Sequence, residues 1–202
     1  ILELMDERNL ITQPALTLPT QERESGPWLR DLLETLVLAL FLFLVANTLT
    51  SRYEVRSISM QPTLYEGQYL VVSKIAYWFH TPTRGDIVVL DPPKSQSDIP
   101  YIKRVVGLPG EHIQIRDGRV WIDGVALNEP YVSGPTIYAD DFVLGPDEYL
   151  VLGDNRNNSS DSHIWGALPR DHIIGKTIFR YWPLEKWGTM PTYAFPELEV
   201  RP

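Results

Sequence analysis

Cysteine is absent from the 202-residue sequence, which excludes disulfide bonds, thiolate metal ligands and cysteine nucleophiles. The redox environment of the protein therefore stays open. Histidine is scarce as well, and His80, His112, His163 and His172 do not have the spacing of metal ligands. We therefore expect no metal site and no cofactor.

An excess of basic residues is also lacking, because 18 Lys and Arg face 26 Asp and Glu and the net charge is −8. Without a clustered cationic surface to replace counterions, a nucleic-acid partner is not expected. The chain is 44 % hydrophobic and long enough to bury a core. One compact domain with an appendage is the natural expectation.

The appendage begins with a polar stretch over residues 1–27, which is rich in Pro, Thr, Gln and Glu and predicts a flexible arm. Leu32–Leu49 follows with a single charge at Glu34, close to the ~20 apolar residues that cross a bilayer as a helix. A buried core helix and a cleavable secretory signal are alternatives. The acidic flank and the exit Asn47-Thr48-Leu49-Thr50 do not suit a cleavable signal. We therefore predict a transmembrane anchor over residues 28–50.

Residues 51–202 are predicted to form a β-rich domain. Asp117-Gly118 joins two alternating runs and can adopt the positive φ angles of a tight hairpin turn. Many short strands without a long amphipathic helix indicate a mainly β, antiparallel, barrel-like fold. The predicted strands are Tyr53–Arg56, Tyr69–Lys74, Asp86–Leu90, Tyr101–Val106, His112–Arg116, Arg119–Ile122, Tyr149–Leu152 and Lys176–Tyr181.

Ser59 lies shortly before Pro62, which ends regular strand pairing and keeps this serine in an exposed turn. A serine near a proline is also an ordinary turn former, so alone it indicates little. The segment Gly153–Gly166 is dense in small polar side chains. It is either a surface loop with Asx turns or a self-bonded loop that positions hydroxyl groups.

Lys103 and Arg104 are adjacent cations inside an apolar strand, Tyr101–Val106. Strand alternation sends them to opposite faces, so one points inward or into a site while the other reaches solvent or a carboxylate. An edge strand with solvated charges is the alternative. Lysine suits the buried role better, because an amine can lose its proton and a guanidinium cannot.

Together these segments resemble the type I signal peptidase family over nearly all of residues 53–183. Four strings match in the family's order, namely S-M-x-P-T-L around Ser59, R-G-D at Arg84–Asp86, Y-I-K-R-V-V-G-L-P-G around Lys103 and G-D-N-R-x-N-S-x-D-S around Ser159. The resemblance implies the signal peptidase β fold. It also implies a membrane-bound serine endopeptidase that removes N-terminal signal peptides after Ala-x-Ala sites.

The resemblance further implies roles for single residues. Ser59 would be the nucleophile and Lys103 the general base, while the Ser57 hydroxyl and the Ser59 N–H would form the oxyanion hole. Ser159 would orient Lys103. An ordinary lysine is only roughly 0.1 % neutral near pH 7.5, a deficit of about 4 kcal/mol, so Lys103 must be desolvated to act as a base.

In the same resemblance, Asp161 and Arg156 would support the polar loop. The sequence departs from the best-known bacterial pattern at His163, where Arg is common, and in having one predicted membrane helix where some relatives have two. Reading His163 as part of a Ser/His triad is disfavoured, because Lys103 fills the position of the base.

The expected partners are signal-peptide-bearing preproteins, a lipid bilayer and, by proximity, the protein export translocon. The substrate would lie extended along a strand edge with small residues in apolar pockets. Candidate pocket residues are Ile58, Met60, Leu64 and Ile102. The aromatics Tyr77-Trp78-Phe79 either pack in the core or enter the membrane interface.

Charge does not orient the anchor, since Arg23 and Arg30 before it are matched by Arg52 and Arg56 after it. The resemblance implies a single-pass protein of the plasma membrane with its catalytic domain on the extracytoplasmic face. A thylakoid membrane with a lumenal domain is the alternative, because the D-S-H-x-W-G string is similar to that of photosynthetic-lineage members.

Two other functions compete. A self-cleaving repressor uses related Ser/Lys chemistry, but it predicts a DNA-binding domain or an internal Ala-Gly site, and the sequence contains no Ala-Gly pair. A non-catalytic, membrane-tethered β domain that binds exported chains differs from the enzyme only in activity.

Overall fold

The computed structural model describes residues 27–92 and 99–199. Its first element is the helix α1 (Pro27–Leu49), in which Trp28–Leu49 has a mean hydropathy of 2.2 and is long and apolar enough to cross a membrane. The flexible arm expected before this helix lies outside the described residues. The helix up to Leu42 belongs to one compact unit, and the chain from Phe43 onward forms a second.

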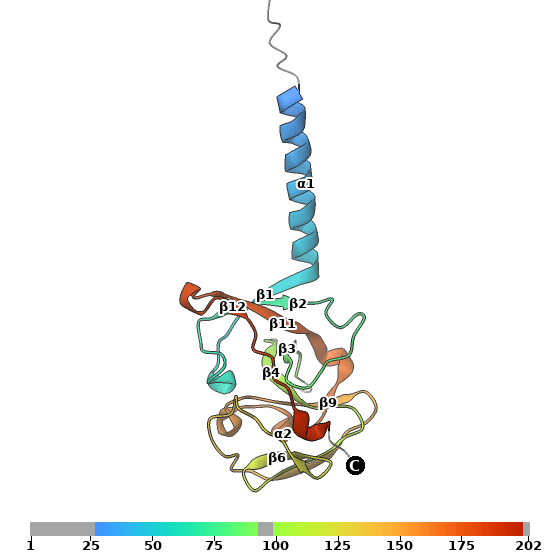
Figure 1. Ribbon diagram of the computed structural model, residues 1–202, viewed down its shortest axis with the longest axis vertical. Helices are drawn as coiled ribbons and strands as arrows, with labels where there is room; N and C mark the ends of the chain where they lie inside the picture. Colours follow the sequence, from blue (N-terminus) through green and yellow to red (C-terminus); the bar gives the residue numbers. More distant parts are fainter. Residues whose placement is uncertain (1–26, 93–98, 200–202) are drawn as a thin grey trace, which may run out of the picture. The chain divides into compact units, whose positions relative to one another are not determined.

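The second unit is built from two antiparallel sheets (Figure 1). The larger sheet has the order β1-β2-β11-β3-β4-β9-β10, with β12 beside β11, and the smaller sheet has the order β7-β6-β5-β8. Their strands are β1 (Thr50–Glu54), β2 (Tyr69–Ser73), β3 (Ile87–Leu90), β4 (Tyr101–Gly107), β5 (His112–Arg116), β6 (Arg119–Ile122), β7 (Val125–Ala126), β8 (Asp140–Val143), β9 (Glu148–Leu152), β10 (Leu168–Pro169), β11 (Ile173–Trp182) and β12 (Gly188–Thr189). The prediction of a mainly β, antiparallel, barrel-like fold behind one apolar helix is confirmed, the larger sheet being curled and open.

Short helical turns connect the strands. They are η1 (Ile58–Met60), η2 (Arg156–Asn158), α2 (Ser162–Trp165), η3 (Arg170–His172), η4 (Leu184–Lys186) and η5 (Pro196–Leu198). Two of these turns, η1 and η2, carry residues of the predicted site. They place this part of the site on connections between strands, where side chains can be held without breaking a sheet.

All eight predicted strands are present, although β1 and β11 each begin three residues earlier than expected. The hairpin between β5 and β6 is confirmed, because Asp117 and Gly118 have φ angles of 54° and 75° and Arg116 pairs with Arg119. The prediction missed β7, β8, β10 and β12. Of these, β7, β10 and β12 have only two residues, too few to show an alternating pattern, and β8 begins with two adjacent aspartates, a residue type that is rare in strands.

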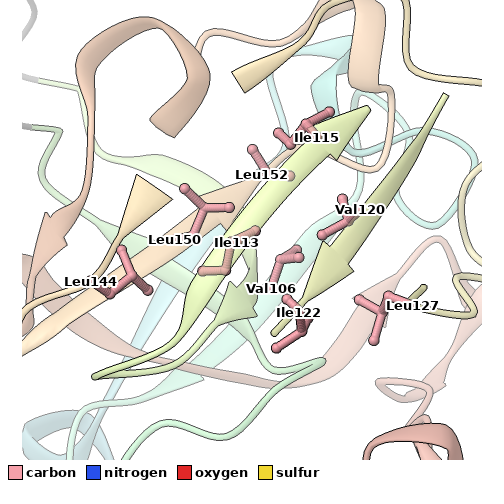
Figure 2. Close-up of a cluster of buried hydrophobic side chains, with 9 residues drawn as sticks. All are labelled: Val106, Ile113, Ile115, Val120, Ile122, Leu127, Leu144, Leu150 and Leu152. Carbon is pink, nitrogen blue, oxygen red and sulfur yellow. The ribbon is translucent and has the colours of Figure 1, made fainter. Parts of the chain in front are cut away.

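One apolar cluster joins the two sheets (Figure 2). Strand alternation turns Ile113 and Ile115 of β5 toward Val106 of β4 and Leu152 of β9. The members drawn in the figure are Val106, Ile113, Ile115, Val120, Ile122, Leu127, Leu144, Leu150 and Leu152. Val106 of β4 packs in this cluster and Val105 of the same strand packs in a second one, so the strand that carries Lys103 is held on both faces.

Candidate active site

Ser59 lies at the centre of the short turn η1, between β1 and β2. The turn is held in place by Met60 and Leu64, which are 1 % and 0 % exposed and pack in a core with Val55. Ser57 caps the turn in an extended conformation, and its hydroxyl accepts a hydrogen bond of 3.1 Å from the Ser59 N–H. The nucleophile candidate therefore sits on a backbone that the core fixes, with a second hydroxyl beside it.

Lys103 reaches Ser59 from the middle of β4, 44 residues later in the chain. Its side chain is buried, and its Nζ donates a hydrogen bond of 2.8 Å to the Ser59 Oγ. At this distance a neutral Lys103 amine can instead accept the proton of the Ser59 hydroxyl. The structure thus brings together the two residues that the sequence singled out as nucleophile and base.

Burial lowers the pKa of Lys103 from its ordinary 10.5 to about 8, although the carboxylates of Asp161 and Asp154 oppose this change. A lysine of pKa about 8 is roughly a quarter neutral at pH 7.5, against about 0.1 % in water. The change corresponds to about 3 kcal/mol of the deficit that a lysine base has to overcome. The site therefore supplies most of the desolvation expected from the sequence.

Arg104 points to the opposite side of β4 and is also fully buried. Its guanidinium binds both carboxylate oxygens of Asp154, at 2.8 and 2.7 Å, and donates to the Gly85 carbonyl at 2.8 Å. The Tyr131 ring lies 4.0 Å from its central carbon. The alternating orientation is confirmed, and the alternative of an edge strand with solvated charges is wrong, because both cations are buried.

The polar loop after β9 packs directly against the nucleophile. The Asn155 N–H donates to the Ser59 carbonyl at 3.0 Å, and its side-chain amide donates to the Ile58 carbonyl at 3.3 Å. A Cβ on Gly153 would lie 2.3 Å from the Ser159 Oγ and 2.5 Å from the Ser59 carbonyl oxygen. Only glycine therefore permits this close approach between the loop and η1.

The Ser159 hydroxyl is buried and has no hydrogen-bond partner among the residues that the structure describes. The bond between Ser159 and Lys103 that the resemblance implies is thus not formed here. A buried hydroxyl without a partner is costly to fold, so its presence beside the nucleophile is consistent with a role in the site. The Ser159 Oγ and the Ser59 carbonyl oxygen both border the point that a Cβ of Gly153 would occupy, so the Ser159 hydroxyl lies beside η1.

The remaining loop residues bond within the loop and to an earlier segment of the chain. Asp161 accepts hydrogen bonds of 2.8 Å from the Gly153 N–H and 2.7 Å from the His163 ring. Arg156 donates to the Gly153 carbonyl and forms a buried ion pair with both oxygens of Glu129. Asp161 and Arg156 both bind Gly153, so the loop is bonded within itself, as one of the two alternatives predicted. The His163 ring contacts Asp161, whereas the Ser59 hydroxyl contacts Lys103, which disfavours a Ser/His triad.

A cleft of about 620 Å³ opens beside Ser59 and Lys103. Met60 and Ile102, two of the four candidate pocket residues, line it. Ile58 is 43 % exposed and Leu64 is fully buried in the core, and neither lines this cleft. The full lining is Arg52, Tyr53, Glu54, Val55, Arg56, Ser57, Ser59, Met60, Ile99, Pro100, Tyr101, Ile102, Lys103, Asn158 and Ser160.

Sequence reasoning missed three residues that hold the site, namely Asp154, Asn155 and Glu129. Asp154 and Asn155 belong to the matched string around Ser159, but nothing in the sequence pairs them with Arg104 or Ser59. Glu129 lies 27 residues before its partner Arg156, in a segment without a strong pattern. In the described ranges, no three His, Asp or Glu side chains are placed to hold a metal ion.

The aromatic run before β3 divides between the two predicted environments. Tyr77 packs against the core and its hydroxyl donates to Asp86 at 2.9 Å. Trp78 and Phe79 are 69 % and 82 % exposed. Core packing therefore accounts for Tyr77 alone.

Comparison with known proteins identifies similar chains. The model of the family described as "Signal peptidase, peptidase S26" matches residues 28–182. A probable signal peptidase I-1 of Synechocystis sp. is 45 % identical over 172 residues, which cover 81 % of this chain and 86 % of that protein. The signal peptidase I of Leptolyngbya laminosa is 42 % identical over 198 residues, covering 90 % and 95 %. Thylakoidal processing peptidase 1 of Arabidopsis thaliana is 36 % identical over 154 residues, covering 71 % and 45 %.

Proposed function

This chain belongs to the signal peptidase family, peptidase S26, and on that premise we propose that it removes N-terminal signal peptides from exported preproteins with Ser59 and Lys103 as its catalytic pair. The observation that carries the proposal is the buried 2.8 Å contact between the Lys103 Nζ and the Ser59 Oγ. The non-catalytic binding domain considered above has no use for a desolvated lysine at a serine hydroxyl, which is costly to fold.

In the first half of the reaction, neutral Lys103 accepts the Ser59 hydroxyl proton while the oxygen attacks the carbonyl carbon of the scissile peptide bond. The resulting tetrahedral intermediate collapses as Lys103 returns the proton to the leaving amine. An acyl ester on Ser59 remains. A water molecule, deprotonated by the same amine, then hydrolyses this ester and restores the free serine.

The oxyanion of each tetrahedral intermediate needs hydrogen-bond donors. The Ser59 N–H and the Ser57 hydroxyl are adjacent, and in this structure the first donates to the second. When the substrate oxygen arrives, rotation of the Ser57 side chain allows both groups to donate to it. Losing one such donor typically costs about 2.7 to 4 kcal/mol in the transition state.

The substrate is proposed to lie extended in the cleft along β4. This strand pairs with β3 from Tyr101 onward, but its pairing with β9 begins only at Arg104. Its first three residues therefore have a free edge toward the cleft, which suits addition of a substrate strand. Met60 and Ile102 provide apolar walls there, consistent with small residues such as Ala one and three positions before the cut.

Helix α1 is proposed to anchor the enzyme in a membrane, which brings it to preproteins as they emerge from the export translocon. A plasma membrane with the catalytic unit on the extracytoplasmic face is the main proposal. The similarity to a thylakoidal processing peptidase supports the alternative of a thylakoid membrane with a lumenal catalytic unit.

The test is cleavage of a purified preprotein with an Ala-x-Ala site by the detergent-solubilised full chain, compared with Ser59→Ala and Lys103→Ala. We expect cutting after the second Ala by the wild type alone, with a rate that rises with pH through about 8 as Lys103 loses its proton. Equal cutting by either variant would refute the catalytic pair. No cutting by the folded wild type would favour the binding domain.

A further inference from the structure

The cleft beside the nucleophile is cationic, although the protein as a whole has a net charge of −8. Its ionisable lining, apart from Tyr53 and Tyr101, consists of Arg52, Arg56 and Lys103 against a single acid, Glu54. Asp91 helps to raise the pKa of Tyr53 but does not itself line the cleft. With Lys103 neutral, one positive charge is still in excess.

The excess charge resides mainly on Arg52. Arg56 is already paired with Glu54, whose Oε2 accepts from its Nε at 2.9 Å. Arg52 is exposed, and the partner of its guanidinium is the neutral side-chain amide of Asn47, at 3.0 Å. Among the residues that the structure describes, no carboxylate lies within ion-pair distance of Arg52. A cation in this state is available to a carboxylate from outside.

The position of Arg52 relates it to a defined part of a substrate. Arg52 and Arg56 lie seven and three residues before Ser59 along one wall, and Met60 and Ile102 provide the apolar walls nearer the reacting serine. An extended substrate advances about 3.3 Å per residue, as does β1, which carries Arg52 and ends at Glu54 before the turn that holds Ser59. If small side chains one and three residues before the cut lie against Met60 and Ile102, the next residues upstream pass Arg52.

We propose that Arg52 makes the enzyme select preproteins with an acidic side chain four to seven residues upstream of the cleavage point and discriminate against a basic one there. This inference rests on the proposed function, because it assigns a specificity to the same cleft. An exposed charge pair contributes modestly, so exchanging Glu for Lys at the best position should change kcat/KM by about two- to thirtyfold. The preference should weaken as salt is added.

The experiment uses the full chain in a non-ionic detergent without lipid. Preprotein variants carry Glu, Gln or Lys at each of the four upstream positions, and kcat/KM is measured for the wild type, Arg52→Gln and Arg52→Glu. Arg119→Gln is the matched control, because it removes an exposed cation on β6, away from the cleft. Thermal unfolding shows whether the variants remain folded.

We expect the wild type and Arg119→Gln to prefer Glu over Lys at one or more positions, Arg52→Gln to lose the preference, and Arg52→Glu to reverse it. The inference is overturned, with the proposed function left intact, if the wild type cleaves the Gln preproteins but does not distinguish Glu from Lys preproteins. The same holds if Arg52→Glu still prefers Glu over Lys. A second arm repeats the assay with anionic vesicles. An Arg52 effect seen only in that arm, and equal for all preproteins, would assign this residue to lipid headgroups and also overturn the inference. Failure to cut even the Gln preproteins would overturn both.

Discussion

Replacing Lys103 by Met should abolish cleavage and at the same time stabilise the fold. The methionine is similar in length and suits the apolar surroundings of this side chain, but it carries no proton. Burial destabilises the protonated form of Lys103 in the wild type and thereby lowers its pKa from 10.5 to about 8. Removing the lysine removes that penalty.

The penalty depends on pH in a definite direction. Between pH 8 and 10.5 the unfolded chain holds the Lys103 proton while the folded chain has lost it, so the stability of the wild type rises with pH in this window. Below pH 8 both states are protonated and the full penalty of about 3 kcal/mol applies. At pH 10 about 1 kcal/mol remains.

Loss of the hydrogen bond to Ser59 offsets about 1 kcal/mol of this gain. The variant should therefore be more stable by about 2 kcal/mol at pH 7 and by nothing measurable at pH 10. For a chain of this length the difference at pH 7 corresponds to a Tm increase of about 4 to 8 °C. The assay is thermal unfolding of the detergent-solubilised full chain at both pH values.

Lys74→Met is the matched control, because this lysine is exposed and its replacement should leave Tm nearly unchanged at either pH. A lower Tm for Lys103→Met at pH 7, or the same increase at pH 7 and pH 10, would refute the argument that burial depresses the pKa of Lys103. Retained cleavage by this variant would refute its role as base.

Three further outcomes are expected. Ser57→Ala should lower kcat about 10²- to 10³-fold with little change in KM, because one oxyanion donor is lost. The control Ser57→Thr keeps the hydroxyl and should retain more activity. An unchanged kcat in the alanine variant would contradict the oxyanion role. Gly153→Ala should inactivate the enzyme and lower Tm, because its methyl group would lie 2.5 Å from the Ser59 carbonyl oxygen, and full activity would show that the loop does not hold η1. The chain has no cysteine, so a single fluorophore can be attached to the Phe79→Cys variant, and we expect its emission to shift to the blue when lipid vesicles are added. The control is Ile137→Cys, because Ile137 is also 82 % exposed, and its fluorophore should show no shift. Equal shifts in the two variants would exclude a specific contact of the aromatic run with lipid.

The sequence by itself determined the apolar helix, the mainly β class and the hairpin at Asp117-Gly118. These features depend on short-range patterns, namely an apolar run, alternation and a dipeptide that tolerates positive φ angles. The same local reasoning placed Lys103 and Arg104 on opposite faces of one strand. Strands of two residues, such as β7, left no such pattern and were missed.

Only the tertiary structure decided how distant residues meet. The contact between Ser59 and Lys103 spans 44 residues, and the buried pair of Arg104 and Asp154 spans 50. The amount by which burial lowers the pKa of Lys103 depends on the cores around β4 and on the opposing carboxylates, which no local pattern specifies. The cationic cleft around Arg52 has the same origin, since it forms only where the end of β1 faces the start of β4.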